Sequence, residues 1–144
     1  MNALLVDINT KHKEYIVEDR KPIVAVDLDD TILKKDLVKW EKYGMDYFGE
    51  SLPFAAEALG HIRSRGWHIL IYTCRLNPII NPNVTTDEAK KRVGEVLDKY
   101  SIPYDEIYGG YGKPLADIYI DDRGFRFTTW VEVIEFMRRL SNEG

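Results

Sequence analysis

The chain has 144 residues, which fits one domain with its own core and is short for two. With 44% hydrophobic residues, 31% charged residues and a net charge of -4, the composition favours a soluble globular protein over a disordered chain, and it argues against a broad basic surface for nucleic acid. Because no apolar run approaches the roughly 18 residues of a membrane span, and the N-terminus turns polar too early for a signal peptide, we expect a cytoplasmic protein with no membrane partner.

The N-terminal part of the chain contains two short apolar segments, ALLVDI (3–8) and EYIVE (14–18), separated by the polar NTKHK. They predict a short hairpin or an N-terminal extension over residues 1–21. No linker or repeat follows, so we expect a single domain that spans residues 1–144.

From residue 23 onward, apolar β-branched runs alternate with segments of helical period. The runs predict strands at 23–27, 68–73, 106–110 and 116–121, and the periodic segments predict helices at 53–65, 85–100 and 129–140. In the last helix, the residues predicted to face inward are Val133, Ile134, Met137 and Leu140. This alternation predicts an α/β fold, a three-layer Rossmann-like arrangement with helices on both faces of a central parallel sheet.

Polar side chains collect at the predicted carboxyl ends of these strands, which is the edge where such folds bind ligands. They form one chemical set of carboxylates, a hydroxyl and a lysine: Asp27, Asp29, Thr73, Lys113, Asp121 and Asp122. This set suits phosphoryl transfer, because Asp27, Asp121 and a backbone carbonyl would offer Mg²⁺ the oxygen ligands that it prefers. The metal would also neutralise carboxylates that otherwise repel one another.

The same residues resemble the motifs of the haloacid dehalogenase (HAD) superfamily of phosphatases and phosphotransferases. DLDDT (27–31) is similar to the first motif and ILIYT (69–73) to the second, while Lys113 resembles the third and the aspartate pair after IYI the fourth. The four motifs occur in the family's order, and the resemblance covers most of the chain after residue 22. It implies a HAD fold in the form of a small capless phosphatase.

The resemblance also implies a role for each motif residue. Asp27 would be the nucleophile that forms an aspartyl-phosphate, and Asp29 the general acid and base. Thr73 and Lys113 would bind phosphoryl oxygens. The metal ligands would be Asp27 through its carboxylate, Asp29 through its backbone carbonyl, Asp121 directly, and Asp122 through water unless it pairs with Lys113.

Each assignment has a simpler alternative. Paired aspartates at a strand end also serve as turn or capping residues. Lys90 and Lys91 are rivals of Lys113, although a lysine pair on a helix is more typical of a solvated face. Arg75, just beyond the second motif, is predicted to bind a substrate phosphate, with pairing to a surface acid as the alternative.

Other phosphate and metal signatures do not fit. A calcium loop would need glycine at the sixth position from Asp27, where Ile32 stands. A phosphate-binding Walker A loop would need serine or threonine after Lys113, where Pro114 stands. A receiver domain has its acidic pair early and its lysine late, whereas here the lysine precedes the final acidic pair.

The sequence is compatible with more than one class of substrate. Only about twenty residues separate Thr31 from the helix predicted at 53, which leaves no room for a cap domain. An open site would accept a phosphorylated small molecule or an exposed phosphate on a larger partner, and a second copy of the chain could cover it as a homo-oligomer. The segment 33–50 carries four aromatic residues that either select the substrate or pack the segment onto the domain: Trp40, Tyr43, Tyr47 and Phe48.

The sequence therefore predicts a Mg²⁺-dependent phosphomonoester hydrolase that works through an aspartyl-phosphate. A phosphatase for nucleotides or nucleic-acid ends is an alternative within the same chemistry. A non-catalytic module that binds metal or phosphate is the alternative from another class.

Overall fold

The structure, a computed structural model, describes residues 3–5, 15–17, 20–110 and 112–142. The chain divides into two compact units, and we describe each by itself. One unit is Lys21–Asp122, which holds every predicted site residue, and the other combines Met1–Arg20 with Arg123–Gly144.

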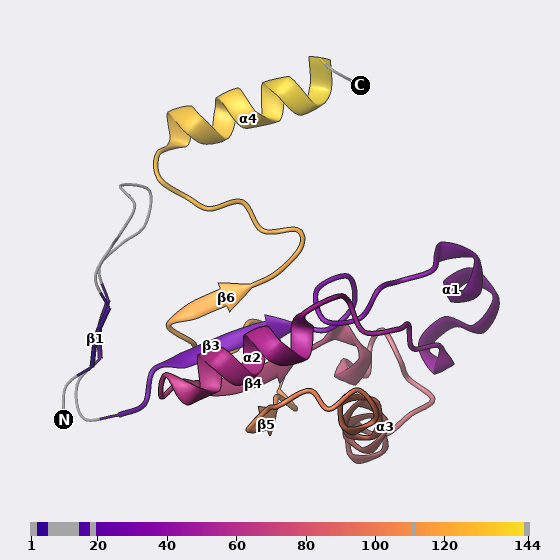
Figure 1. Ribbon diagram of the computed structural model, residues 1–144. Coiled ribbons are helices and arrows are strands. Elements are labelled where there is room, and N and C mark those ends of the chain that lie inside the picture. The colour runs from indigo at the N-terminus through magenta and orange to yellow at the C-terminus, as the bar shows by residue number, and fades with distance from the viewer. Residues whose placement is uncertain (1–2, 6–14, 18–19, 111, 143–144) are drawn as a thin grey trace. The chain divides into compact units, whose positions relative to one another are not determined.

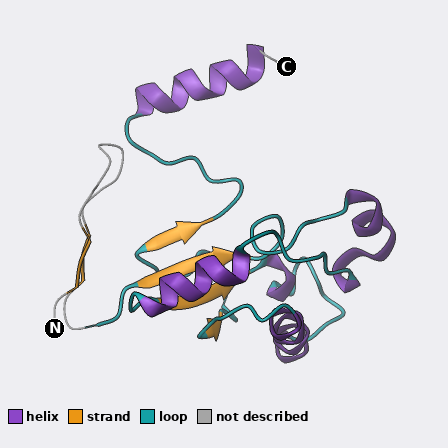
Figure 2. Ribbon diagram, viewed as in Figure 1, coloured by secondary structure: helices purple, strands orange, loops and turns teal. Residues whose placement is uncertain are grey.

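The larger unit is built on a parallel sheet of four strands in the order β5-β4-β3-β6 (Figures 1 and 2). The central strand is β3 (Ile23–Asp27), which lies between β4 (His68–Tyr72) and β6 (Ile118–Ile120), and the short β5 (Glu106–Ile107) adds to the far side of β4. The middle residues of β3 and β4 are all buried, as expected for apolar, β-branched runs that are covered on both faces.

Two helices connect these strands. After β3 the chain forms α2 (Ala55–Ser64) before β4, and after β4 it forms α3 (Thr86–Lys99) before β5. Both crossovers advance in the same direction across the sheet, so right-handed connections place both helices on one face. The Thr85 hydroxyl caps the start of α3 by accepting a hydrogen bond from the backbone N–H of Glu88 (3.1 Å).

The core of this unit joins the two helices to that face of the sheet. Because side chains alternate along a strand, Val24 and Val26 of β3 point to the same side as Ile69 and Ile71, their neighbours in β4. These side chains share one buried cluster with residues of α2 and α3, among them Leu59, Val93 and Leu97. The sheet edge at the end of β3 is therefore held by packing from two helices.

Between β3 and α2 the chain forms α1 (Leu37–Tyr43) and a 3₁₀ turn, η1 (Gly44–Asp46). The Asp36 carboxylate caps α1 by accepting hydrogen bonds from the N–H groups of Val38 (3.0 Å) and Lys39 (3.2 Å). A second 3₁₀ turn, η2 (Cys74–Leu76), follows β4. The described residues contain no separate cap domain.

The other unit contains β1 (Ala3–Leu5), β2 (Tyr15–Val17) and α4 (Trp130–Asn142). The two strands pair antiparallel, as the predicted hairpin requires, and the residues predicted to connect them lie outside the described part of the chain. In α4, the inward packing predicted for Val133, Ile134, Met137 and Leu140 stays a prediction, because this helix belongs to a unit that we describe by itself.

The chain thus has an α/β fold, consistent with the Rossmann-like three-layer arrangement predicted from its sequence. None of the helices described is both long enough and apolar enough to cross a membrane. The single domain predicted over residues 1–144 stays a prediction.

Candidate metal centre and active site

The register of the sheet brings three strand ends together. Asp27, the last residue of β3, is the neighbour of Tyr72 in β4, and Val26 is the neighbour of Ile120 in β6. Asp121, which directly follows β6, therefore lies beside Asp27 at the carboxyl edge of the sheet.

The turn after Asp27 is anchored by buried side chains. Leu28, Ile32 and Leu33 are at most 1% exposed, and the backbone N–H groups of Ile32 and Leu33 both donate to the carbonyl of Leu28 (2.9 and 3.0 Å). Asp30 takes a left-handed conformation (φ 61°), which aspartate tolerates better than most residues. Because Leu28 and Ile32 are buried on either side of it, this tight turn fixes the backbone that carries Asp29 and Asp30.

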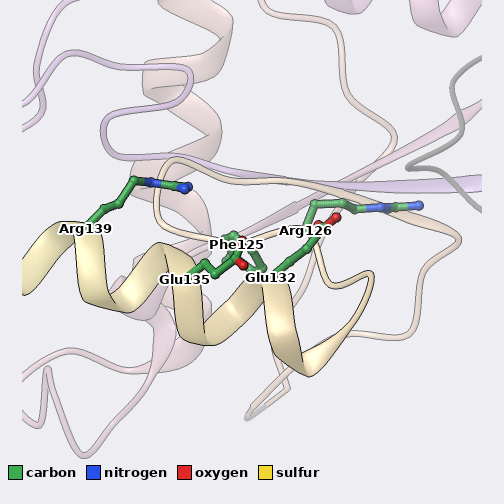
Figure 3. Close-up of a pocket in the computed structure, with 5 residues that line it drawn as sticks. All are labelled: Phe125, Arg126, Glu132, Glu135 and Arg139. Carbon is green, nitrogen blue, oxygen red and sulfur yellow. The ribbon is translucent and has the colours of Figure 1, made fainter.

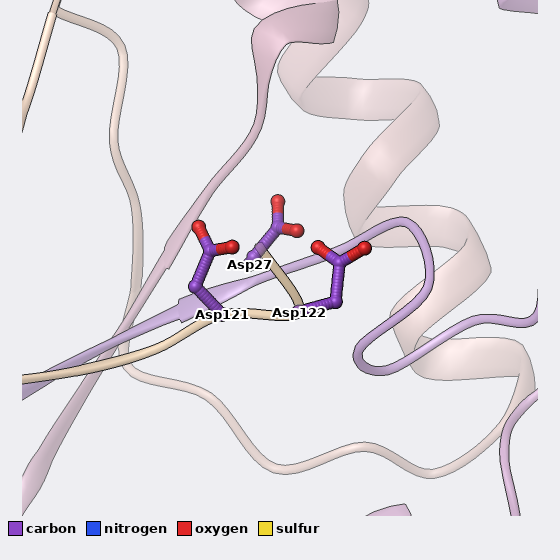
Figure 4. A group of neighbouring side chains, drawn as sticks. All are labelled: Asp27, Asp121 and Asp122. Carbon is purple, nitrogen blue, oxygen red and sulfur yellow. The ribbon is translucent and has the colours of Figure 1, made fainter. Parts of the chain in front are cut away.

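Three carboxylates meet at this edge, those of Asp27, Asp121 and Asp122 (Figure 4). One oxygen from each lies within 4.8 Å of the others, with Asp27 partly buried and the other two exposed. This donor set contains oxygen only, which suits a hard cation such as Mg²⁺ better than a metal that prefers nitrogen or sulfur. It comprises three of the four residues predicted as metal ligands.

The environment of Asp27 disfavours its charge when no cation is present. Burial, followed by the nearby charge of Asp121, raises the pKa of Asp27 from 3.8 to about 7. A hydrogen bond with the backbone of Leu28 acts in the opposite direction, and Asp122 adds to the increase. The site therefore favours the binding of positive charge, because a cation would relieve the repulsion among the carboxylates.

Tyr72 is a further member of the site that the sequence analysis did not identify. Its hydroxyl donates a hydrogen bond to Oδ2 of Asp121 (2.5 Å), and burial together with this bond raises the pKa of the phenol. The parallel pairing of the strands at 23–27 and 68–73 could have identified it, because that pairing sets Tyr72 beside Asp27.

A cavity of about 310 Å³ opens next to the carboxylates. It is lined by Asp27, Thr73 and neutral polar or small residues, namely Tyr72, Cys74, Asn77, Tyr108, Gly110 and Gly112. The hydroxyl of Thr73 accepts from the backbone N–H of Arg75 (3.3 Å), which leaves its own hydrogen to donate toward the cavity. Thr73 thus shares a cavity with Asp27, as a residue that binds a phosphoryl oxygen would.

Asp29 and Arg75 form a pair of their own. The Arg75 guanidinium donates from Nε to Oδ2 of Asp29 (2.9 Å) and from Nη2 to Oδ1 (2.8 Å). Arg75 is only 2% exposed. A substrate phosphate, which the sequence predicted as its ligand, would have to displace these partners.

Of the three lysine candidates, Lys113 and Lys90 have different neighbours. Nζ of Lys113 stands 4.3 Å from the ring centre of Tyr119. Lys90, its rival on α3, packs against the glycine-rich loop, since a Cβ placed on Gly109 would lie 2.6 Å from Cε and 2.9 Å from Nζ of Lys90. The neighbouring Gly110 lines the cavity. Lys90 therefore packs on the loop that borders the cavity, and its side chain is not surrounded by solvent alone.

A second cavity, of about 300 Å³, belongs to the other unit (Figure 3). Its lining combines two carboxylates and two guanidinium groups with one ring, from Phe125, Arg126, Glu132, Glu135 and Arg139. None of the predicted site residues is among them. The chemistry predicted from the sequence therefore concerns the cavity at the sheet edge.

Fold and site together define an α/β protein with a candidate carboxylate metal centre at the carboxyl edge of its sheet. A solved structure of a conserved protein from Bacteroides thetaiotaomicron is similar, with a TM-score of 0.51 and 21% identity over 83% of this chain and 92% of that one. A crystal structure of a Vibrio cholerae protein aligns with 25% identity and a TM-score of 0.46 over 82% of this chain and 98% of that one. The Bacteroides structure supports the fold alone. No protein-family model matches the chain, and no curated protein matches it.

Proposed function

We propose that this chain is a Mg²⁺-dependent phosphomonoester hydrolase of the HAD type that works through an aspartyl-phosphate on Asp27. The observation that carries the proposal is the meeting of Asp27, Asp121 and Asp122 within 4.8 Å at the carboxyl edge of the sheet. The cavity shared by Asp27 and Thr73 supports it, because a nucleophile and a phosphoryl-binding hydroxyl must reach the same phosphate.

Asp27, Asp121 and Asp122 would hold the metal, and Asp29 would add its backbone carbonyl. When bound, Mg²⁺ would keep Asp27 ionised and offset the repulsion between that carboxylate and the phosphoryl oxygens. Thr73 would orient one phosphoryl oxygen by donating its hydroxyl hydrogen. Lys113 would supply a positive charge to the transferring group, with Lys90 as the alternative donor.

In the first step, a carboxylate oxygen of Asp27 attacks phosphorus and forms an acyl-phosphate bond. The bond from phosphorus to the ester oxygen breaks, and Asp29 donates a proton to the leaving alcohol. In the second step, Asp29 takes a proton from water, whose oxygen attacks phosphorus. Inorganic phosphate leaves and the Asp27 carboxylate is regenerated, so atoms and charges balance over the cycle.

The substrate class that fits this site is a phosphorylated small molecule or an exposed phosphate on a larger partner. The cavity holds roughly the volume of a drug-sized ligand or smaller, and its neutral hydroxyl and amide groups would hydrogen-bond a polar leaving group. Phosphate on a nucleotide or a nucleic-acid end is the alternative substrate. A homo-oligomer that covers the site and a cytoplasmic location both stay predictions.

The test is phosphate release from a panel of phosphorylated sugars, nucleotides, oligonucleotide ends and one aryl phosphate, with Mg²⁺ and with a chelator. Wild type should release phosphate only with Mg²⁺, and Asp27→Asn should abolish release. Asp87→Asn, an acid-to-amide change in the first turn of α3, is the matched control and should keep full activity. Full activity of Asp27→Asn would overturn the mechanism, and binding of Mg²⁺ without release of phosphate from any ester would favour a non-catalytic module.

A further inference from the structure

Arg75 is the one charged side chain that is buried among the described residues, at 2% exposure. Burying a charge is costly unless it is paired and hydrogen-bonded, and arginine stays protonated at any ordinary pH. The contacts that surround Arg75 therefore show which groups it holds in place.

One group is the carboxylate of Asp29. The two bonds from Nε and Nη2, at 2.9 and 2.8 Å, form the parallel fork in which guanidinium and carboxylate planes match. Asp29 is itself largely buried, with its side chain 15% exposed. Each carboxylate oxygen keeps a second lone pair, so a further partner can still bind Asp29 while the fork holds its orientation.

The other group is the stretch between β3 and α2, which we call the 36–48 segment. Nη1 of Arg75 donates to the carbonyl of Met45 (2.7 Å), and Nη2 donates to the carbonyl of Tyr47 (2.6 Å). The Arg75 Cζ atom lies 4.1 Å from the ring centre of Phe48 and 4.9 Å from that of Trp40. Two of the four aromatic rings predicted to select substrate or to pack are thus packed on this arginine.

Every nitrogen of the guanidinium that bears hydrogen has an acceptor in one of these two groups. The guanidinium of Arg75 thus binds the 36–48 segment and Asp29 at the same time, so a shift of the segment would also shift Asp29. A lysine could not reproduce this, because it offers a point charge and no fork.

We propose that Arg75 is a positioning residue, which orients Asp29 for proton transfer and couples that orientation to the 36–48 segment. The first part rests on the proposed function, in which Asp29 protonates the leaving alcohol. The second part concerns the linkage alone and holds whether or not the chain is a phosphatase.

The catalytic part is tested with aryl phosphates that differ in the basicity of the leaving phenol. 4-Nitrophenolate leaves without much help from an acid, whereas phenolate needs protonation. Arg75→Met should lower kcat/KM for phenyl phosphate by about 100-fold, the size of a general-acid contribution, and should lower it only a few-fold for 4-nitrophenyl phosphate. Asp29→Asn should show the same pattern, and the double variant should be no worse than Asp29→Asn alone.

Arg92 provides the matched control. From α3 it also binds the segment, through Asp46 (2.8 Å), but no contact joins it to Asp29 in the described structure. Arg92→Met should leave the ratio of the two kcat/KM values unchanged. Equal losses of Arg75→Met on both esters would reduce Arg75 to a structural residue and overturn the catalytic part.

The linkage is tested without any activity, by cleavage of the folded chain with trypsin after Lys39 and Lys42, which are exposed on α1. Asp29→Asn should speed this cleavage about tenfold, because its amide turns an N–H toward the fork and weakens the hold of Arg75 on the segment. In a chain that already carries Arg75→Lys, Asp29→Asn should cause no further increase in the rate of cleavage. Unchanged cleavage of Asp29→Asn would overturn the linkage, even if Arg75→Met failed to fold.

The two failures can be told apart. If wild type hydrolyses no ester, the proposed function fails and the trypsin experiment still decides the linkage. If wild type is a phosphatase with an unaltered leaving-group ratio in Arg75→Met, the positioning role alone fails.

Discussion

Tyr72 donates its phenolic hydrogen to Oδ2 of Asp121 over 2.5 Å, and so joins the end of β4 to the acidic group at the end of β6. The strand between them, β3, ends at Asp27. The hydrogen bond therefore crosses the end of β3 and orients the carboxylate of Asp121, one of the three candidate metal ligands. Partners of this kind hold metal ligands in the geometry that the metal requires.

Removing this hydroxyl should weaken metal binding. Tyr72→Phe keeps the ring and frees Oδ2 of Asp121 to rotate, so we expect the Kd for Mg²⁺ to rise by about tenfold, the lower end of such effects. Isothermal titration with Mg²⁺ measures this change. Tyr43→Phe, at an exposed residue of α1, is the control and should leave the Kd unchanged. An unaltered Kd in Tyr72→Phe would show that the hydrogen bond does not orient the ligand.

Mg²⁺ should stabilise the folded chain through the three carboxylates. A ligand present at about 100 times its Kd adds roughly 2.7 kcal/mol to the free energy of unfolding, so the Tm should rise with Mg²⁺ concentration. Asp121→Asn and Asp122→Asn should each reduce the rise, and Asp87→Asn should preserve it. Thermal unfolding followed by circular dichroism is the measurement, and an equal rise in all four proteins would place the metal elsewhere.

Without metal, the stability of the chain should fall as pH increases from about 4 to about 7. The pKa of Asp27 is about 7 in the folded chain and 3.8 as its ordinary value, so the folded state binds this proton more tightly than the unfolded state. The resulting stabilisation is complete below pH 3.8 and is lost as pH rises through 7. Urea unfolding with a chelator, at pH 5 and pH 8, should show a smaller difference for Asp27→Asn than for wild type. Identical differences in the two proteins would contradict this assignment.

Two glycine-to-alanine changes should have opposite effects on stability. At Gly49, a Cβ would lie 1.6 Å from the backbone oxygen of Lys34, beside the hydrogen bond from Lys34 N–H to the Glu50 carbonyl (2.7 Å). Gly49→Ala should therefore lower the free energy of unfolding by roughly 1–3 kcal/mol. At Gly60, inside α2, a Cβ meets nothing within 4 Å.

Gly60→Ala should raise the free energy of unfolding by roughly 0.5–1 kcal/mol, because alanine loses less backbone entropy than glycine in a helix. Urea titration of both variants gives the two values. A stabilising Gly49→Ala would mean that the strand-like contact between Lys34 and Glu50 is not made in solution.

Much of the larger unit could be predicted from local patterns. The strand at Ile23–Asp27 was predicted with its bounds, because a short β-branched run followed by a turn of aspartates leaves few alternatives. A helix over residues 85–100 was predicted from its period, and the structure has it at Thr86–Lys99 with the Thr85 hydroxyl as its cap. β5 is shorter than predicted, two residues in place of five, because an edge strand pairs only where its neighbour reaches it.

The acidic group is an intermediate case. Its members could be predicted because parallel strands all end at one edge, and the structure brings Asp27, Asp121 and Asp122 to within 4.8 Å. Tyr72 was missed, since a tyrosine inside an apolar run is typical of any strand. Only the pairing of β3 with β4 shows that its hydroxyl belongs to the site.

Arg75 marks the limit of what local sequence determines. Beside a predicted active edge, an arginine is equally suited to a substrate phosphate and to a carboxylate of the protein. The choice depends on where the 36–48 segment lies, because its carbonyls and rings supply the partners that make burial of the charge possible. The sequence by itself therefore determined the order of the strands along the chain and which charges stand near their carboxyl ends. Only the tertiary structure decided that Arg75 pairs with Asp29, since this pairing depends on contacts between residues about 30 to 46 positions apart.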